Sequence, residues 1–422
     1  MKILEYCHDE DLVSFFKPRL VFLLCVFSFF AFACDHDEKH DLKTFPTEFT
    51  EGDFNFDTIA SDLVIIPLDF GEITVSQIMD VKWREPYLYI CSAEGTGVGR
   101  LSLFDLDGKL IKTMDRSGRG PGEYLSIQQF GVDDNGTIYI NTWHKVVVYD
   151  RQLNHVRDIK WPDDLNFAEM YFHEDHIFLF SETAGKVPHY DWVILDTTGN
   201  VINTKLFNCY PETSYPPPFP LIIFKSNNKL YRYRSISDTI FRVGLSDYSP
   251  EYFVRRQYDD GYRNYTKEEI SKNIRWDRLM QSLYNVKLRY IESINAIGSS
   301  WIISYRTHIN RNVKSETAIY DQKKEKMTLI NRCNIILDEP TLWGIPNDWV
   351  GYGTIKPEGV AKINNKNYII SFMDAVRLKD MVNSNGFKNA IPQRPEIKQK
   401  FQEIADTLTM NDNPVLILVK LK

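Results

Sequence analysis

The sequence has few cysteines and no excess of basic residues, and both shortages narrow the class of protein. It holds 6 Cys in 422 residues, with 50 Lys and Arg against 57 Asp and Glu, a formal net charge of -7. No basic stretch stands out as an electrostatic footprint, so we expect no nucleic-acid partner. The composition excludes coiled coil and collagen. At 43% hydrophobic and 14% aromatic, the chain can bury a large core.

Long hydrophobic runs are also missing, apart from one near the N-terminus. Residues 20–33 (LVFLLCVFSFFAFA) are uncharged, follow Lys17 and Arg19, and end in small residues directly before Cys34. These 14 residues are fewer than the ~20 that a membrane-spanning helix needs. The order of charge, apolar run and small residues is that of a secretory signal, so we predict a signal peptide over residues 1–33.

The bond between Ala33 and Cys34 resembles the lipobox of bacterial lipoproteins, although an ordinary signal peptidase would cut at the same place. In lipoproteins the thiol after the cut takes a diacylglycerol. The charged residues 35–41 resemble the surface-export signal of Bacteroidota lipoproteins. The resemblance implies a membrane-anchored outer-membrane lipoprotein of the cell envelope, periplasmic or surface-exposed. Residues 34–60 are then a tether.

Few cysteines remain for disulfides. Cys7 and Cys25 leave with the signal peptide and Cys34 is the proposed lipid site, so the remaining thiols are Cys91, Cys209 and Cys333. An odd number at wide spacing does not indicate a disulfide framework, even in an oxidising compartment.

What the sequence does contain is a repeat of short strands separated by Gly, Asn and Asp turns. An aromatic-rich run occurs at residues 87–90, 137–140, 177–180, 230–233, 301–305 and 368–372. The turns that follow carry Asp105, Asp150 and Asp196, at the spacing of a four-stranded propeller blade. We predict an all-β fold, a six-bladed β-propeller over residues 61–422 with small helical insertions on one face.

The two ends of this repeat are expected to pair. Residues 413–421 (NPVLILVKL) supply the third strand of the last blade, and residues 63–67 (LVIIP) precede the first blade without another partner. Pairing them closes the ring and removes the open sheet edges.

A family resemblance rests on residues 116–124 (RSGRGPGEY). This run resembles the R-x-G-x-G-P-G-E-Y segment of the six-bladed β-propeller lipoproteins of Bacteroidales, which are related to NHL-repeat propellers. Residues 132–150, 237–242 and 413–422 resemble the same family in the expected order. The resemblance implies the fold and the location. It adds little about chemistry, because most members have no established activity.

Propeller topology assigns the long connections to one face. Successive strands a to d of a blade alternate in direction, so d-to-a and b-to-c connections share a face. The long segments all join strands in this way: residues 116–124, 209–220, 255–285, 334–359 and 374–413, the last with a helix marked by Ile397, Phe401, Ile404 and Leu408. Long ordered loops on a rigid scaffold usually carry binding residues. We therefore place the binding site on this face.

The candidate ligand-binding residues of this face are aromatic or charged. Flat rings with polar edges suit stacking on sugars or anchoring of peptides, although most aromatic residues serve packing. The candidates are Arg119, Glu123, Tyr124, Trp143, Tyr190, Tyr215, Trp276, Trp343, Trp349 and Tyr352. The glycines around Arg119 lack the Gly-Lys-Ser/Thr ending of a phosphate loop, which favours a structural turn in which Arg119 and Glu123 pair.

Few residues of the sequence point to catalysis. His144, His189 and His308 fall on the same face and would support zinc chemistry if they converged, but exposed or hydrogen-bonded histidines are the favoured interpretation. Neither H-E-x-x-H nor G-x-S-x-G occurs. Residues 105–108 (DLDG) begin like a calcium loop but lack its distal Glu.

Three hypotheses follow. The first is a lipid-anchored binding module for a saccharide, a peptide or an envelope protein, without catalysis or a cofactor. The second is a metal-dependent lyase or lactonase of the NHL-propeller type. The third is a scaffold subunit of an envelope complex.

Overall fold

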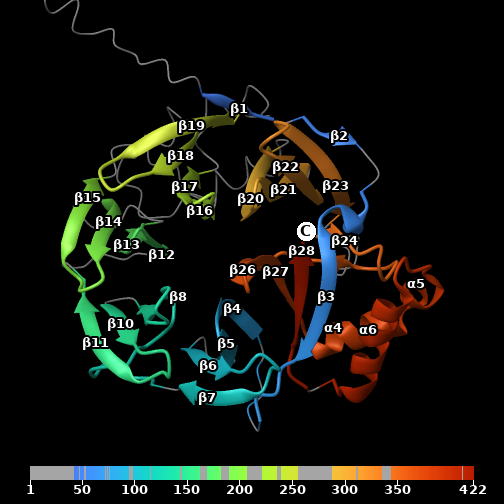
Figure 1. The fold of residues 1–422 in the computed structure, drawn as a ribbon, viewed down its shortest axis with the longest axis horizontal. Coiled ribbons are helices and arrows are strands. Elements are labelled where there is room, and N and C mark those ends of the chain that lie inside the picture. Colours follow the sequence, from blue (N-terminus) through green and yellow to red (C-terminus); the bar gives the residue numbers. More distant parts are fainter. Residues whose placement is uncertain are drawn as a thin grey trace, which may run out of the picture. The chain divides into compact units, whose positions relative to one another are not determined.

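Six antiparallel sheets surround a central axis in a ring (Figure 1). The prediction of an all-β, six-bladed propeller is confirmed. The structure is a computed structural model; it describes residues 42–422 except 47, 52–53, 72, 74, 76, 95–97, 115, 143–144, 162–168, 182–189, 207–220, 235–238, 255–287, 310–311, 335–343 and 411. Residues 43–422 form one compact unit.

In the first five blades, the strands follow one another in chain order from the axis outward. Blade 1 consists of β4 (Gln77–Arg84), β5 (Tyr87–Glu94), β6 (Val98–Phe104) and β7 (Leu110–Met114), and blade 2 of β8 (Gln129–Val132), β9 (Ile138–Asn141), β10 (Lys145–Tyr149) and β11 (His155–Lys160). Blade 3 consists of β12 (Glu169–His173), β13 (His176–Phe180), β14 (Tyr190–Asp196) and β15 (Val201–Leu206). Blade 4 consists of β16 (Leu221–Ser226), β17 (Lys229–Arg234), β18 (Thr239–Val243) and β19 (Tyr248–Val254). Blade 5 consists of β20 (Leu288–Ile297), β21 (Ser300–Ile309), β22 (Asn312–Asp321) and β23 (Lys326–Asn334).

The blades stack because their strands bury both faces. In β9, Ile138 and Ile140 pack in a cluster with Leu103 of blade 1. Tyr139, between them, packs in another cluster with Ile177 of blade 3. Successive side chains of a strand point to opposite faces, so an unbroken apolar run serves two neighbours at once. This is why the aromatic runs at the second strand of each blade are continuous rather than alternating.

The recurring aspartates stabilise the turns between the third and fourth strands. Asp105 Oδ1 accepts hydrogen bonds from the backbone N–H of Asp107 and of Lys109. Asp150 and Asp196 make the same contacts two and four residues ahead. Such a side-chain bond replaces a backbone turn bond, which explains why aspartate recurs at this turn in blades 1, 2 and 3. Residues 105–108 are accordingly a strand turn, as expected.

Blade 6 closes the ring with strands from both parts of the chain. It consists of β26 (Gly359–Ile363), β27 (Lys366–Met373), β28 (Val415–Leu421) and β3 (Ala60–Pro67). β28 and β3 are antiparallel, with Ile417 opposite Ile65 and Val419 opposite Leu63. The predicted pairing of the two ends is therefore confirmed.

The propeller begins earlier than the sequence suggested. β1 (Lys43–Phe45) adds a fifth, parallel strand to β19 of blade 4, and β2 (Thr50–Glu51) does the same to β23 of blade 5. The short helix η1 (Phe56–Thr58) follows. We call residues 43–58 the N-terminal strap. The predicted tether of residues 34–60 must be corrected at its end, because the strap pairs with two blades and buries Phe45 and Phe56 completely.

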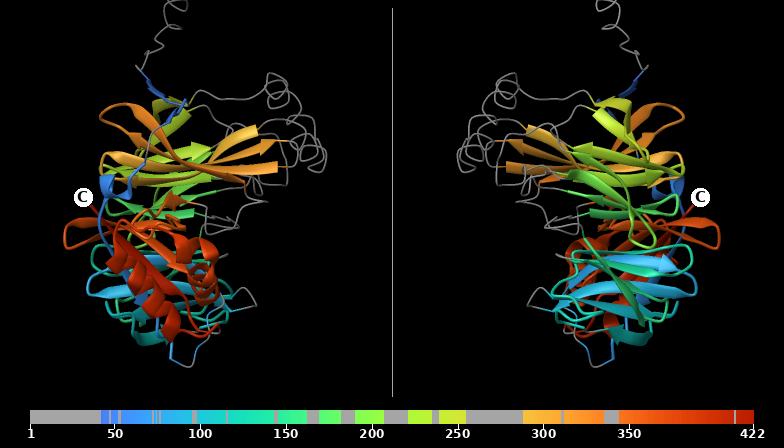
Figure 2. Two further views of the ribbon diagram at one scale, coloured as in Figure 1. Left: turned by 90° about the vertical axis from the view of Figure 1, so that its right-hand side faces the viewer. Right: turned by 90° about the vertical axis from the view of Figure 1, so that its left-hand side faces the viewer.

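The insertion between β27 and β28 is helical but does not cover the predicted face. It contains α4 (Ala375–Asn383), α5 (Asn385–Asn389) and α6 (Pro395–Thr407). Leu378 and Phe401 share a buried cluster with Leu63 of β3. The helices therefore lie on the outer side of blade 6 (Figure 2), because their apolar stripe packs on the outermost strand. The small sheet of β24 (Ile345–Pro346) and β25 (Thr354–Ile355) contributes Ile345 and Ile355 to the same cluster.

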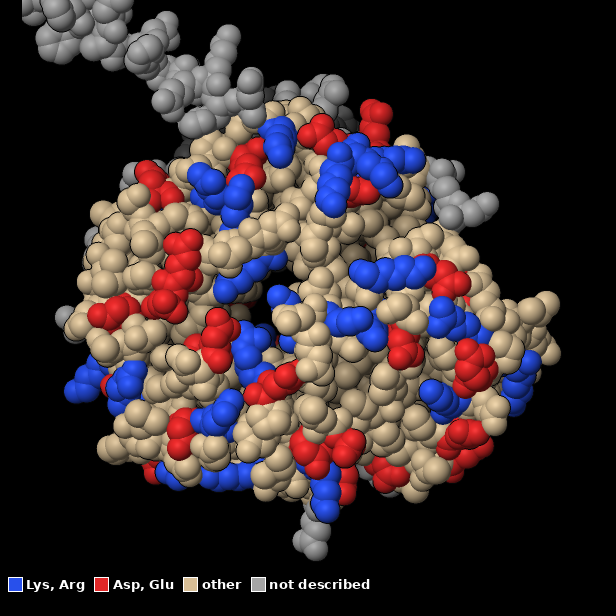
Figure 3. All heavy atoms as spheres, in the orientation of Figure 1, with Lys and Arg blue, Asp and Glu red and all other residues tan. Residues whose placement is uncertain are grey.

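The short turns share the face shown in Figure 3, where the ring is hollow at its centre and charged side chains of both signs surround the opening. Lys225 lies near the end of β16 and Arg84 at the end of β4, each next to the short turn that follows its strand. The pKa of Lys225 is lowered, chiefly by desolvation and to a smaller extent by the like charge of Arg84. The opening is therefore polar rather than an extension of the core.

Candidate ligand-binding site

The loop of residues 116–125, which joins blades 1 and 2, is folded back on itself by its own backbone. Gly118 N donates to Tyr124 O (3.1 Å), and Tyr124 N donates to Arg116 O (3.0 Å). Glu123 N closes the tip on Gly120 O (3.1 Å). These bonds make the loop a rigid element rather than a variable surface connection.

The glycines of the loop are required by close approaches. The Glu123 carboxylate turns into the loop, where its Oε2 accepts from Gly120 N (2.8 Å). A Cβ on Gly118 would lie 2.0 Å from that oxygen. Gly122 has a φ of +71° and would place a Cβ 2.7 Å from the His155 ring. The expected structural turn is therefore correct, but Glu123 is held by the backbone instead of pairing with Arg119.

Tyr124 anchors the loop instead of facing solvent. It is 1% exposed, and its hydroxyl donates to Met114 O (3.3 Å) at the end of β7. Beside it, the Tyr149 hydroxyl donates to Gly122 O (2.5 Å). The Tyr124 ring is covered by the core of blades 1 and 2, so this candidate has little surface to offer a ligand.

Asp158 of β11 joins the loop to blade 2. Its carboxylate accepts from Lys145 Nζ (2.7 Å), His155 Nε2 (2.9 Å) and Gly122 N (3.2 Å). Burial opposes ionisation, but these hydrogen bonds outweigh it and lower the pKa of Asp158. Lys145 Nζ also donates to Gly120 O (2.9 Å). The outer strands of blade 2 thus hold the loop in one position.

A cavity of about 370 Å³ lies between the loop and the ends of β9, β10 and β11. Its volume is in the range of small-molecule sites. The lining residues are Gly118, Arg119, Gly120, Pro121, Glu123, Tyr124, Leu125, Thr142, Lys145, Asp158 and Lys160. The cavity is on the predicted face, because these strand ends border the d-to-a and b-to-c connections. Three of the predicted candidates, Arg119, Glu123 and Tyr124, line it.

Lys145, Asp158 and Lys160 were missed by sequence reasoning. They belong to the two outer strands of blade 2, whereas the loop precedes that blade in the chain. A usable signal existed: the end of each fourth strand and the start of each third strand reach the same face as the loops. Charged residues at those strand ends therefore belong with the loop residues when candidates are chosen.

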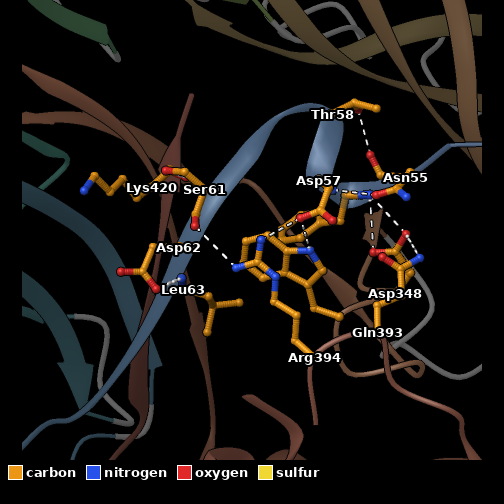
Figure 4. A network of polar contacts seen from close by, with 12 residues as sticks. Asn55, Asp57, Thr58, Ser61, Asp62, Leu63, Asp348, Gln393, Arg394 and Lys420 are labelled. Atoms are coloured by element: carbon orange, nitrogen blue, oxygen red, sulfur yellow. Dashed lines mark hydrogen bonds and ion pairs between the residues drawn. The ribbon is translucent and has the colours of Figure 1, made fainter. Parts of the chain in front are cut away.

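Trp349 lies in the core beside the N-terminal strap. It is 0% exposed, and its Nε1 donates to Asp57 Oδ1 (2.8 Å). The Arg394 guanidinium lies 3.5 Å from the centre of the indole ring and also binds Asp57 (2.7 Å), as Figure 4 shows. Desolvation raises the pKa of Asp57, but hydrogen bonds from Trp349 and Arg394 outweigh this effect, so the pKa is lowered. The expected ligand contact of Trp349 must be corrected, because strap and helices cover its ring.

The other described candidates lie apart from the cavity. Tyr190 begins β14 and is half-buried against the cluster between blades 2 and 3. Tyr352 packs on α5, where a Cβ on Gly386 would lie 2.2 Å from the tyrosine ring. Trp143, Tyr215, Trp276 and Trp343 lie outside the described residues.

The histidine hypothesis stays a prediction. His144 and His189 lie outside the described residues, and His308 is placed on β21 without a description of its side chain. In the part of the chain that is described, no three or more His, Cys, Asp or Glu side chains gather as a metal site would require. The described residues also include no helix long and apolar enough to cross a membrane.

Fold and cavity define the class of this protein as a six-bladed β-propeller with a cavity, bordered by charged side chains, beside the loop between its first two blades. The chain belongs to the family described as "Domain of unknown function (DUF4934)", which it matches over residues 44–420. The match starts within β1, in agreement with the inclusion of the N-terminal strap in the propeller. No curated protein matches the sequence.

Two solved structures from Bacteroides are similar to this chain. One, a Bacteroides fragilis protein named "Putative exported protein", has 16% identity and a TM-score of 0.63, over 90% of this chain and 99% of that chain. A member of the DUF4221 family from Bacteroides vulgatus has 11% identity and a TM-score of 0.49, over 86% of this chain and 97% of that chain. At such identity, the first similarity supports the fold alone.

Proposed function

We propose that this chain is a binding module of the cell envelope, held to the outer membrane by lipid on Cys34, which captures a saccharide, a peptide or an envelope protein without catalysis. The observation that carries the proposal is the cavity of about 370 Å³ beside residues 116–125. Its wall is a rigid loop braced by Asp158 and Lys145, and preformed hollows of this kind bind ligands without a large ordering cost.

The charged groups of the cavity support binding rather than proton transfer. A general acid or base works best when its pKa is near the working pH. The pKa of Asp158 is below its usual value, so this carboxylate stays ionised at neutral pH and serves as a fixed acceptor. Glu123 is likewise committed to Gly120 N. Both carboxylates therefore hold the loop in shape.

The envelope location is supported by the apolar run of residues 20–33 and by Cys34 directly after it. Cells that express the full chain are expected to incorporate labelled palmitate into it, and Cys34→Ser is expected to abolish the label. Cys25→Ser, within the run itself, is the matched control and should keep the label. Equal labelling of both variants would show that Cys34 is not the lipid site.

Blocking the cavity tests the binding function. Leu125 lines the cavity and Leu106 lies in a turn on the opposite face, and each is 40% exposed. A binding array of saccharides and peptides, screened with the chain lacking residues 1–33, first identifies ligands. We expect Leu125→Trp to weaken the affinity for these ligands at least tenfold. Leu106→Trp should leave that affinity unchanged. Affinity that survives Leu125→Trp would place the binding site elsewhere.

A further inference from the structure

The cavity beside residues 116–125 has an uneven charge balance. Three cations line it, Arg119, Lys145 and Lys160, against the carboxylates of Glu123 and Asp158. The charged groups of the lining therefore sum to one positive charge before any ligand enters. Because protein borders the hollow on several sides, such an excess attracts anions more strongly than the same charges on a flat surface would.

The two carboxylates are already engaged by the protein itself. Glu123 Oε2 accepts from Gly120 N, inside the loop. Asp158 accepts from Lys145, His155 and Gly122 N. Lys145 is engaged as well, because its Nζ bridges Asp158 and Gly120 O. These residues form the frame of the cavity rather than its contact groups.

Arg119 and Lys160 are the other two charged groups of the lining. Both side chains are exposed, and neither makes a hydrogen bond or ion pair through its side chain with any residue that the structure describes. They reach the cavity from two different elements, Arg119 from the loop and Lys160 from the end of β11. A guanidinium and an ammonium facing one hollow are the groups that bind carboxylate and sulfate oxygens in proteins.

The size of the cavity indicates what carries the anion. About 370 Å³ is more room than one Asp or Glu side chain of a peptide needs, and it lies near the lower end of the range for small-molecule sites. Carbon atoms, including those of Pro121 and Leu125, form most of the lining surface, and polar and charged groups form the smaller part. A sugar ring with one charged substituent suits this mixture of surfaces.

We propose that the cavity binds an acidic sugar residue, with its carboxylate or sulfate held between Arg119 and Lys160. This proposal rests on the proposed binding function and specifies its ligand. The contact is electrostatic and partly open to solvent, so its strength falls as salt screens the two cations. Neutral sugars of the same shape gain nothing from these cations and bind far more weakly.

Calorimetric titration with glucuronate and with glucose tests the charge requirement, because the two ligands differ at one carbon. We expect glucuronate to bind, glucose to bind at least tenfold more weakly, and the difference to shrink between 50 mM and 500 mM salt. Inorganic sulfate should compete with glucuronate. Failure of glucuronate to bind, or equal binding of glucose, overturns the proposal. Tighter binding of a short poly-glutamate peptide than of glucuronate overturns the choice of a sugar.

Substitutions of the two cations test where the anionic group of the sugar binds. Arg119→Ala and Lys160→Ala are each expected to weaken glucuronate binding about tenfold, and Arg119→Lys to weaken it less because the charge is kept. Lys109→Ala, an exposed lysine in a turn on the opposite face, is the control and should have no effect. Unfolding curves establish that each variant is folded. If Leu125→Trp abolishes binding of an array ligand while Arg119→Ala and Lys160→Ala do not, the anion proposal fails and the binding function stands.

Discussion

Phe45→Ala is expected to lower the free energy of unfolding of the propeller by about 3–5 kcal/mol, the range for removing a fully buried aromatic ring. Phe45 belongs to a strand of three residues, yet its side chain is 0% exposed. Its ring lies 4.9 Å from that of Tyr320 and 5.9 Å from that of Trp301, both on blade 5, while its backbone pairs with blade 4. The strap thus fills the outer gap between two blades.

Thr44→Ala is the matched control for this prediction. Thr44 is the neighbour of Phe45 in β1, pairs with the same strand and has an exposed side chain, so its loss should change stability by no more than about 0.5 kcal/mol. Urea unfolding followed by tryptophan fluorescence measures both variants, and the burial of Trp301 beside Phe45 makes that signal responsive. Equal midpoints for the two variants would mean that the strap is dispensable to the folded state.

The strap also shows where sequence reasoning fails. Two strands of two and three residues, each pairing in parallel with a strand more than 200 positions away, leave no periodic pattern in the chain. Their pairing is decided by the outer edges of blades 4 and 5, which exist only after the blades have formed. The available signal was a set of aromatic residues, Phe45, Phe49 and Phe56, in a segment otherwise typical of a tether.

The blades themselves were predictable because each repeats a local pattern. Aromatic runs mark the second strands, and an aspartate such as Asp150 marks a turn that any strand pair of that geometry needs. Pairing of residues 63–67 with residues 413–421 followed from counting strands, since a ring with one strand missing must take it from the other end. The side of blade 6 covered by helices was not predictable, because it depends on which apolar surface is left open.

The candidate site also contains residues that could be predicted from the sequence and residues that could not. The loop of residues 116–124 was found because glycines at close approaches leave a sequence signature, as at Gly118 and Gly122. Lys160 was missed because nothing local distinguishes a strand-end lysine that faces a cavity from one that faces water. Trp349 was chosen for its residue type, which does not separate a ring on a surface from one enclosed by Arg394 and Phe56.

Ile417→Asp is expected to cost more than about 4 kcal/mol and to leave little folded protein, because it places an unpaired charge in a closed core. Ile417 is 0% exposed in the middle of β28, between Ser371 of β27 and Ile65 of β3. Its side chain packs in the cluster that includes the helical insertion, while the adjacent Leu416 packs toward blade 1. The substitution therefore disrupts the one blade built from both parts of the chain.

Val64→Asp provides the comparison, since it introduces the same charge into the same strand pair on the side that faces water. Val64 lies opposite Leu418 and is 43% exposed, so the cost should be about 1 kcal/mol or less. Thermal unfolding and the yield of soluble protein measure both variants, and similar losses would show that the closing blade is not a continuous core. Blade 6 also borders blade 1, from which the loop with Arg119 emerges, so an intact closure is what allows a rigid cavity to exist at that loop.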